Sequence, residues 1–238
     1  MNDLKREILI LKNPRKAKDL QRFFKTGKGE YGEGDLFLGI TVPQQRELVK
    51  RYFDKLNLKE IQKLLDSEFH EERLIGLLIL VKRFEKNLYE REKIFKFYLK
   101  NSKKVNNWDL VDLTAPNIVG NFLLDNDRHI LSKLCKSKNL WKRRISIVST
   151  YSFIRQNQFK YTIEISRNLL RDKEDLIHKA VGWMLREIGK RDVETLRKFL
   201  DENLLEIHNT TLRYSIEKMS LEERKNYLMR KRKLRSKQ

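Results

Sequence analysis

The sequence predicts an all-α protein, a HEAT-like α-α superhelix in which antiparallel helix pairs stack into a curved solenoid. Only 9 Gly and 3 Pro occur in 238 residues, and charged residues make up 36% of the chain against 39% hydrophobic residues. This composition favours long amphipathic helices over turned strands, and it supports a substantial buried core. The chain also repeats a pattern of a short helix, a polar turn and a longer helix, which is typical of a solenoid of helix pairs.

The first segment, residues 3–24, is predicted to form two short amphipathic helices. Pro14 separates them, because proline disfavours helical geometry in the residue before it. A loop at Gly27–Gly34 follows and contains the spacing G-x-G-x-x-G. A nucleotide fingerprint needs a preceding strand and a following helix, and here Glu30 and Glu33 would repel phosphate. We therefore do not interpret this loop as a nucleotide site.

A further helix is predicted to begin at Thr41, which is a suitable N-cap with Pro43 in the first turn. From Leu58 onward the chain reads as helix pairs, at 58–65 and 71–84, at 130–134 and 140–155, and at 163–170 and 175–190. In each second helix a basic residue precedes a small one by three: Arg73 and Gly76, Arg143 and Ser146, Lys179 and Gly182. The small residue is expected to let neighbouring helices pack closely. The offsets of 70 and 36 residues correspond to two periods and one period of the repeat.

The missing unit of this repeat contains residues 106–120, NNWDLVDLTAPNIVG, in which Trp108 and Asp112 are four residues apart. On a helix such a pair shares one face of one turn, with a carboxylate beside a broad π surface. This pairing suits the stabilisation of a developing positive charge. Two structural alternatives stay open: Trp108 as a core residue, and Asp112 as the cap of a next helix that has Pro116 near its start. Asp109 points about 100° away from Trp108 and is expected to be a capping or salt-bridge partner.

The charge balance predicts a polyanionic partner, because 53 Lys and Arg against 33 Asp and Glu give a formal net charge of +20. Nucleic acid is favoured over a membrane, since no segment is a basic amphipathic anchor and no apolar run approaches the length of a transmembrane helix. The single cysteine, Cys135, excludes an internal disulfide and fits a reducing compartment. The histidines are scattered and the first residues are not a convincing signal peptide, so we expect a cytoplasmic protein without a metal.

The second helices of successive pairs line one side of a solenoid, so their basic residues predict a stripe that meets the phosphates of a duplex without reading bases. This stripe would contain Arg73, Arg143, Arg144, Lys179 and Arg186. The alternative is an ordinary solvated surface. Residues 230–238 carry a further six basic side chains. We interpret them as a frayed helix end or a disordered arm that adds non-specific phosphate attraction.

Four separated stretches, in this order, resemble the AlkD-like DNA alkylation repair family. They are GEGDLFLGITVP at 32–43, NNWDLVDLTAP at 106–116, LWKRR at 140–144 and KAVGWMLREIGK at 179–190. Members of this family are HEAT-like-repeat glycosylases that remove N3- and N7-alkylated purines. The resemblance runs through most of the chain. The departures are the arginine-rich LWKRR and the long basic C-terminal extension, both of which concern the DNA contacts rather than the chemistry.

By position, the resemblance implies an active site of Trp108, Asp112 and a second tryptophan, Trp183, with Arg144 contacting a phosphate. Asp112 would stabilise the sugar cation and orient a water, and the two tryptophans would flank the lesion nucleotide. Arg143 is expected to add a DNA contact, as is Lys179 in the next repeat. The alternatives are core packing for Trp183 and an ordinary surface charge for Arg144. The family is thought to approach DNA from the backbone, and the sequence leaves this mode and base flipping both open.

These observations predict a monofunctional DNA glycosylase of base excision repair that hydrolyses the N-glycosidic bond of cationic alkylpurines, 3-methyladenine and 7-methylguanine, in double-stranded DNA. The alternatives are a non-catalytic HEAT-repeat protein that binds damaged or branched DNA, and a protein scaffold. Residues 1–229 are expected to form one HEAT-like-repeat domain and residues 230–238 a basic tail. We expect a monomer that uses no cofactor or metal and contacts no membrane.

Overall fold

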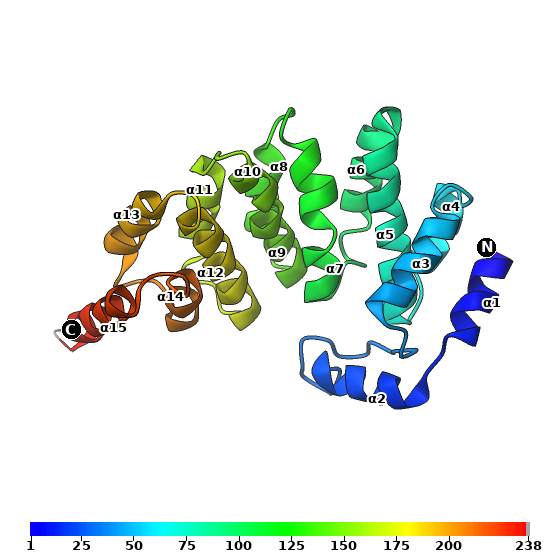
Figure 1. The fold of residues 1–238 in the computed structure, drawn as a ribbon, viewed down its shortest axis with the longest axis horizontal. Coiled ribbons are helices and arrows are strands. Elements are labelled where there is room, and N and C mark those ends of the chain that lie inside the picture. Colours follow the sequence, from blue (N-terminus) through cyan, green and yellow to red (C-terminus); the bar gives the residue numbers. More distant parts are fainter. Residues whose placement is uncertain (237–238) are drawn as a thin grey trace. The chain divides into compact units, whose positions relative to one another are not determined.

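The computed structural model describes residues 1–236 and confirms the all-α fold, since within these residues every regular element is a helix (Figure 1). The described residues contain one isolated parallel bridge, between Leu36 and Phe69. Residues 237 and 238, at the end of the predicted basic tail, lie outside the described residues. The chain divides into two compact units, Met1–Phe122 and Leu123–Gln238.

The first unit follows the predicted elements closely. It contains α1 (Asn2–Ile10), α2 (Pro14–Phe23), α3 (Val42–Tyr52), α4 (Leu58–Leu65), α5 (His70–Lys86), a 3-10 turn η1 (Leu88–Glu90), α6 (Arg91–Lys100), α7 (Trp108–Asp112) and a π-helical turn η2 (Pro116–Gly120). Pro14 opens α2, and Thr41 is the N-cap of α3, as the sequence predicts. Helices α4 and α5 pack together as the first predicted pair.

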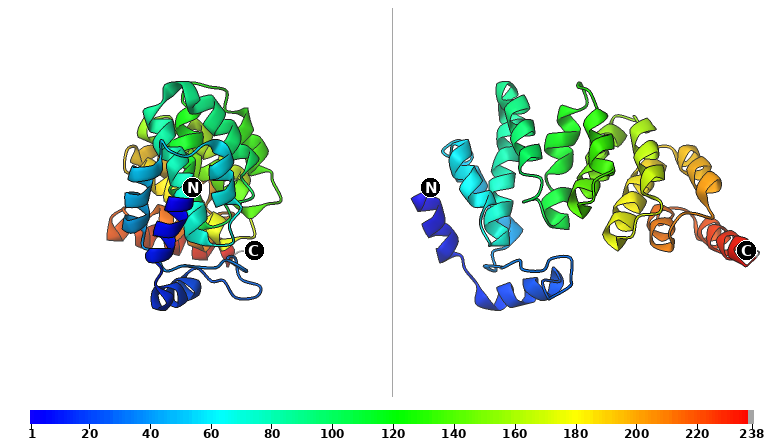
Figure 2. Two further views of the ribbon diagram at one scale, coloured as in Figure 1. Left: turned by 90° about the vertical axis from the view of Figure 1, so that its right-hand side faces the viewer. Right: turned by 180° about the vertical axis from the view of Figure 1, so that it is seen from behind.

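The second unit contains the other two predicted helix pairs, α8 with α9 and α11 with α12. Its elements are α8 (His129–Cys135), α9 (Leu140–Ser149), α10 (Tyr151–Arg155), α11 (Lys160–Leu169), α12 (Asp175–Gly189), α13 (Val193–Asn203), α14 (Asn209–Ser215) and α15 (Leu221–Arg235). Helix α12 is the centre of this unit, because it packs against α9, α11, α13 and α14 (Figure 2). Residues 230–235 of the predicted tail belong to α15. In the part of the chain that is described, no helix has the length and apolar character needed to cross a lipid bilayer.

The predicted long helix over residues 140–155 is instead two helices, α9 and α10, that meet at Thr150. The hydroxyl of Thr150 donates a hydrogen bond to the carbonyl oxygen of Ile147 at 2.7 Å, and Ser149 donates to Ile145 at 2.6 Å. Such hydroxyls compete with the backbone for carbonyls and disturb a helix. Two adjacent side chains of this kind account for the break that the apolar pattern did not reveal.

The small residues of the repeat do lie at close helix contacts, as predicted, but not all against the same partner. A Cβ on Gly76 would lie 3.1 Å from Leu64 of α4, the first helix of its own pair. The equivalent Gly182 instead faces α14, where a Cβ would lie 2.5 Å from the Cβ of Tyr214 and 2.7 Å from the carbonyl oxygen of Thr211. Backbone cannot yield as easily as side-chain atoms, so of these two positions Gly182 is the one where the absence of a side chain matters more.

We expect Gly182→Ala to lower the free energy of unfolding by about 1–3 kcal/mol, because the added methyl group overlaps α14. Gly76→Ala is the matched control. Its methyl group is tight only against side-chain atoms of Leu64 and Leu65, at 3.1 and 3.2 Å, with the backbone oxygen of Ile61 at an ordinary 3.7 Å. The better helix propensity of alanine offsets up to about 1 kcal/mol. Urea unfolding followed by circular dichroism measures both variants, and equal stability of the two would contradict the close approach of α12 and α14.

Candidate active site

The candidate pair Trp108 and Asp112 forms the two ends of α7, a single turn of helix. The side-chain oxygen of Asn107 caps this turn by accepting a hydrogen bond from the backbone N–H of Trp108 at 2.8 Å. Trp108 and Asp112 are both half-buried. The next helical turn, η2, has Ala115 as its N-cap, so Asp112 does not serve as the cap that was the alternative interpretation. The predicted i, i+4 pairing therefore exists on a formed helical turn.

Trp108 belongs to an aromatic cluster at the edge of the core of the first unit. Its ring stacks on Phe24, with centroids 5.2 Å apart and planes 20° apart, and Phe24 stacks in turn on Phe37 at 5.0 Å. Phe23 meets Trp108 edge-on at 5.9 Å. Each such pair contributes roughly 0.5–1.5 kcal/mol beyond the burial of its area. The cluster fixes the orientation of the indole ring while leaving part of it exposed.

Asp109 follows Trp108 on α7 and anchors that helix to α5 through His70. His70 Nε2 lies 2.8 Å from Asp109 Oδ2, and His70 Nδ1 lies 3.1 Å from Asp35 Oδ2. Arg73 donates to the other oxygen of Asp35 at 2.6 Å. All four side chains are buried. The expectation that Asp109 is a salt-bridge partner is confirmed, and the chain of charges joins a loop, α5 and α7.

Sequence reasoning missed His70 and Asp35 as members of this site. Asp35 lies within the GEGDLFLGITVP stretch, and His70 begins a helix whose first turn is otherwise acidic. Those were the available signals, but neither revealed the pairing, because the partners of His70 are 35 and 39 residues away in the sequence.

Burial disfavours the charged ring of His70, but the attraction and hydrogen bond of Asp109, with the hydrogen bond of Asp35, outweigh it. Together they raise the pKa of His70 to about 9. Burial also disfavours the charged form of Asp35. The hydrogen bond of His70 and the charge of Arg73 nevertheless hold the pKa of that carboxyl below its usual value. The network is therefore buried and holds a charged His70 at neutral pH, with cations and carboxylates alternating in the order Arg73, Asp35, His70, Asp109.

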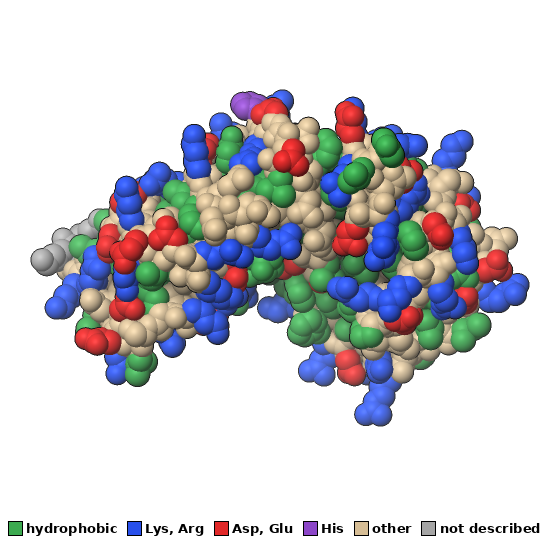
Figure 3. All heavy atoms as spheres, turned by 45° about the horizontal axis from the view of Figure 1, so that its top comes forward, with side chains coloured by type: hydrophobic (Ala, Val, Ile, Leu, Met, Phe, Trp, Pro, Cys, Tyr) green, Lys and Arg blue, Asp and Glu red, His purple; other side chains and the backbone are tan. Residues whose placement is uncertain are grey.

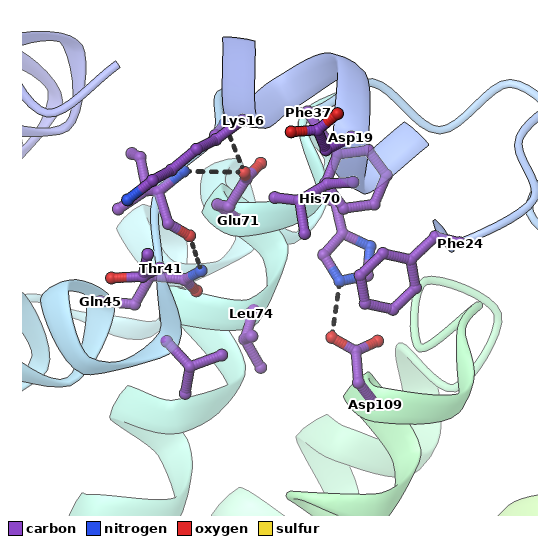
Figure 4. Close-up of a pocket in the computed structure, with 14 residues that line it drawn as sticks. Lys16, Asp19, Phe24, Phe37, Thr41, Gln45, His70, Glu71, Leu74 and Asp109 are labelled. Atoms are coloured by element: carbon purple, nitrogen blue, oxygen red, sulfur yellow. Dashed lines mark hydrogen bonds and ion pairs between the residues drawn. The ribbon is translucent and has the colours of Figure 1, made fainter. Parts of the chain in front are cut away.

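A cavity of about 180 Å³ lies beside this network, within the first unit (Figure 4). His70 and Asp109 line it, among mainly apolar walls, and its described lining does not include Trp108 or Asp112. Glu71 also lines it, but the Glu71 carboxylate accepts hydrogen bonds from the backbone N–H groups of residues 38, 39 and 40 at 2.9, 2.8 and 3.2 Å. The carboxylate thus holds the loop in place. Among residues 1–236, no group of three or more His, Cys, Asp or Glu side chains is placed to hold a metal ion.

The other candidate residues lie in the second unit. Trp183, on α12, is half-buried, and its ring centroid is 5.9 Å from that of Tyr151 on α10. Arg144, on α9, is only 5% exposed and donates a hydrogen bond to the backbone carbonyl of Leu176 in the first turn of α12. Arg144 is thus held firmly between two helices. The roles that the family resemblance implies for Trp183 and Arg144 stay predictions.

Arg143 caps the turn between the two helices of its pair. Its Nη1 donates to the carbonyls of Ser137 and Lys138, both at 3.0 Å, and its Nε and Nη2 reach Asp172 at 2.6 and 3.1 Å. Arg73 donates in the same way to the carbonyls of residues 67 and 68 at 3.0 and 3.1 Å. In these two repeats the basic residue therefore has a structural role that the sequence pattern did not suggest. The DNA contact expected of Arg143 stays a prediction, without support from this geometry.

Several members of the predicted basic stripe have partners inside their own unit, and the stripe itself stays a prediction. On the face shown in Figure 3, Lys and Arg side chains are interspersed with Asp and Glu side chains. The internal partners are Asp35 for Arg73, Asp172 for Arg143, Asp175 for Lys179 and Glu217 for Arg186. Much of the positive charge on the second helices thus serves the packing of the units.

Comparisons with known proteins agree on one family. A family model described as DNA alkylation repair enzyme matches residues 4–219. A solved structure described as a predicted DNA alkylation repair enzyme from Enterococcus faecalis superposes with a TM-score of 0.70 at 17% sequence identity, covering 88% of this chain and 97% of that one. At that identity the likeness shows the fold alone. No curated protein matches the sequence.

We expect the network around His70 to make stability depend on pH. The pKa of His70 is about 9 in the folded protein against 6.5 for the free side chain. The stabilisation, on the order of 3 kcal/mol, is therefore fully present below about pH 6.5 and is lost as the pH rises through 9. Thermal unfolding of wild type and His70→Gln between about pH 5.5 and pH 10 measures it (about one unit beyond each pKa). The difference between the two proteins should shrink across this window; a constant difference would contradict a charged His70.

We also expect Arg143→Ala to lower the free energy of unfolding by roughly 3 kcal/mol, because it removes the charged partner of Asp172 and the donor to two turn carbonyls. Lys142→Ala, one position earlier on α9, is the control and should be nearly neutral. Urea unfolding and duplex-DNA titration are run on both variants. Unchanged stability together with weakened DNA binding would contradict this structural role and support Arg143 as a DNA contact.

Proposed function

This chain belongs to the family of DNA alkylation repair enzymes, and we propose that it is a monofunctional DNA glycosylase that removes cationic N3- and N7-alkylated purines from duplex DNA. The observation that carries the proposal is the Trp108–Asp112 pair on α7. This turn of helix is fixed at its start by the Asn107 cap and in its middle by the buried Asp109–His70 contact. A carboxylate and an indole ring held in this way are pre-organised for charge stabilisation.

The substrate class follows from the residue types. A purine alkylated at N3 or N7 already carries a positive charge, so it leaves the sugar without protonation and needs no general acid. What remains is to stabilise an oxocarbenium-like sugar and to orient a water, and one carboxylate serves both ends. Asp112 takes this role in our proposal. The Trp108 ring offers its π face to the cationic nucleotide.

We assign supporting roles to two residues of the second unit. Trp183 would offer a second aromatic face to the lesion nucleotide, and Arg144 would hold a phosphate. These roles rest on the positions of both residues in the matched family stretches rather than on their contacts. Each is tested independently of Asp112 by its own alanine variant in the assay described below.

A monofunctional reaction, without strand cleavage, is supported by the buried position of Lys231, a lysine whose pKa is lowered. Burial, and the nearby charge of Arg235, lower the pKa of Lys231 to about 8. A lysine of this kind is the usual nucleophile for a Schiff base. Lys231 is nevertheless 3% exposed, and its Nζ donates to the carbonyls of Leu204, Leu205 and Ile207. It is therefore inaccessible to a sugar carbon.

We expect Asp112→Asn to lower the release of 7-methylguanine from duplex DNA by at least roughly 100-fold, because it removes a charge that acts mainly in the transition state. Affinity for undamaged duplex should change by less than about threefold. Free base is measured under single-turnover conditions and affinity by fluorescence anisotropy. Asp54→Asn, an exposed carboxylate in the same unit, is the control that removes the same charge elsewhere.

Release by wild type and by Asp54→Asn alone would establish both the activity and its carboxylate. If Asp112→Asn remains as active as wild type, the assignment of Asp112 is wrong. If no protein releases base while duplex binding stays tight, the non-catalytic DNA-binding alternative replaces the glycosylase.

A further inference from the structure

Helix α15 lies beyond the part of the chain that matches the family. The match ends at residue 219, and α15 spans Leu221–Arg235. The helix carries seven Lys or Arg residues and two Glu residues, both of which are in its first turn. Its apolar and polar residues are not divided between two sides, because charged side chains surround most of the helix. A helix of this composition, outside the matched part of the chain, requires a separate explanation.

One side of α15 is firmly docked on the second unit. Tyr227 is buried, and the Nζ of Lys231 donates to the carbonyls that follow α13, at 2.9 Å for Leu204. Arg230 pairs with Asp201 at 2.8 Å, and near the start of the helix Glu223 accepts hydrogen bonds from Arg197. The helix is therefore held in one orientation, which fixes the directions of its other side chains.

Four exposed cations share a different side of the helix: Arg224, Lys225, Arg232 and Arg235. At 100° per residue they fall within an arc of about 100°, roughly 60° to 160° around the helix from Tyr227. Among residues 1–236, no carboxylate lies within ion-pair distance of any of the four. The stripe is about 16 Å long, at 1.5 Å per residue.

Several arginines elsewhere in the second unit have carboxylate partners. Arg167 pairs with Glu202, Arg171 with Glu206 and Arg186 with Glu217. These three arginines each face a carboxylate, whereas the cations of the α15 stripe repel one another. Uncompensated like charges on a rigid helix favour an external polyanion.

We propose that the stripe of Arg224, Lys225, Arg232 and Arg235 on α15 binds the phosphodiester backbone of duplex DNA, outside the region matched by the family. This inference rests on the proposed function for the identity of its polyanion. The contact is electrostatic and independent of sequence, since arginine and lysine side chains on this side reach phosphates rather than base edges. A lipid surface is less suited, because the exposed apolar side chains of α15, Leu221, Met229 and Leu234, are spread around the helix rather than gathered on one side.

The test is the salt dependence of binding to undamaged duplex DNA, with all four residues changed to Gln in the full chain. Each phosphate contact contributes about 0.9 to the slope of log K against log salt, so the slope should fall by about 3–4. Affinity at low salt should fall at least about tenfold. The control changes Lys133, Lys136, Lys160 and Lys173 to Gln. These lysines are exposed in the same unit, and their replacement removes the same total charge. Its slope should match that of wild type.

Changing Arg224, Arg232 and Arg235 to Lys retains the charges and should retain the slope, which separates loss of charge from loss of folding. An unchanged slope in the Gln variant, or an equal fall in the control, would overturn the proposal. Loss of binding to vesicles of phosphatidylserine, with an unchanged DNA slope, would overturn it in favour of a membrane surface. Base release is measured separately at saturating protein, so a failed glycosylase activity leaves the slope result interpretable, and the reverse also holds.

Discussion

The contact of buried His70 with Asp109 is the constraint on which the first unit depends. Removing either partner would leave a charge without compensation in the interior, at a cost of several kcal/mol. His70 also contacts Asp35 in the loop that precedes α3, and Asp35 in turn binds Arg73. The loop, α5 and α7 must therefore all be in place before any of these charges is satisfied. The same contacts fix the positions of Trp108 and Asp112, since Asp109 lies between them on the same turn of helix.

The chain uses its excess of basic residues in two different ways. Arg73 and Arg143 act inside the fold, where each bridges the carbonyls of an interhelical turn and a carboxylate from another element. Such buried arginines add to the net charge of +20 without offering a free cation to a partner. The exposed cations of α15 do the opposite. A formal net charge therefore overstates the binding surface, and only the contacts of individual side chains show which part of it is available.

The sequence predicts local features of this protein well and long-range pairings poorly. Helix starts at Pro14 and Thr41 were predicted correctly, because N-caps and proline act on their own neighbours. The Trp108–Asp112 pair was predictable for the same reason, being one turn of helix. The break at Thr150 was missed, since hydroxyl side chains only sometimes disrupt a helix. The Asp35–His70–Asp109 network was missed altogether, because no periodic pattern links residues that are brought together by the packing of separate elements.

Chemistry and attraction to DNA place opposite demands on a protein, and in our proposal this chain meets them with different residues. Stabilising a developing cation requires a carboxylate held rigidly in a partly desolvated position, which the buried contacts of α7 provide. Attraction to a duplex requires exposed cations that exchange with counterions, and its strength falls as salt rises. A carboxylate placed among those cations would lose part of its field to screening. In our proposal these two requirements fall on different helices, α7 and α15, so salt should change the affinity for DNA far more than the rate of the bound complex.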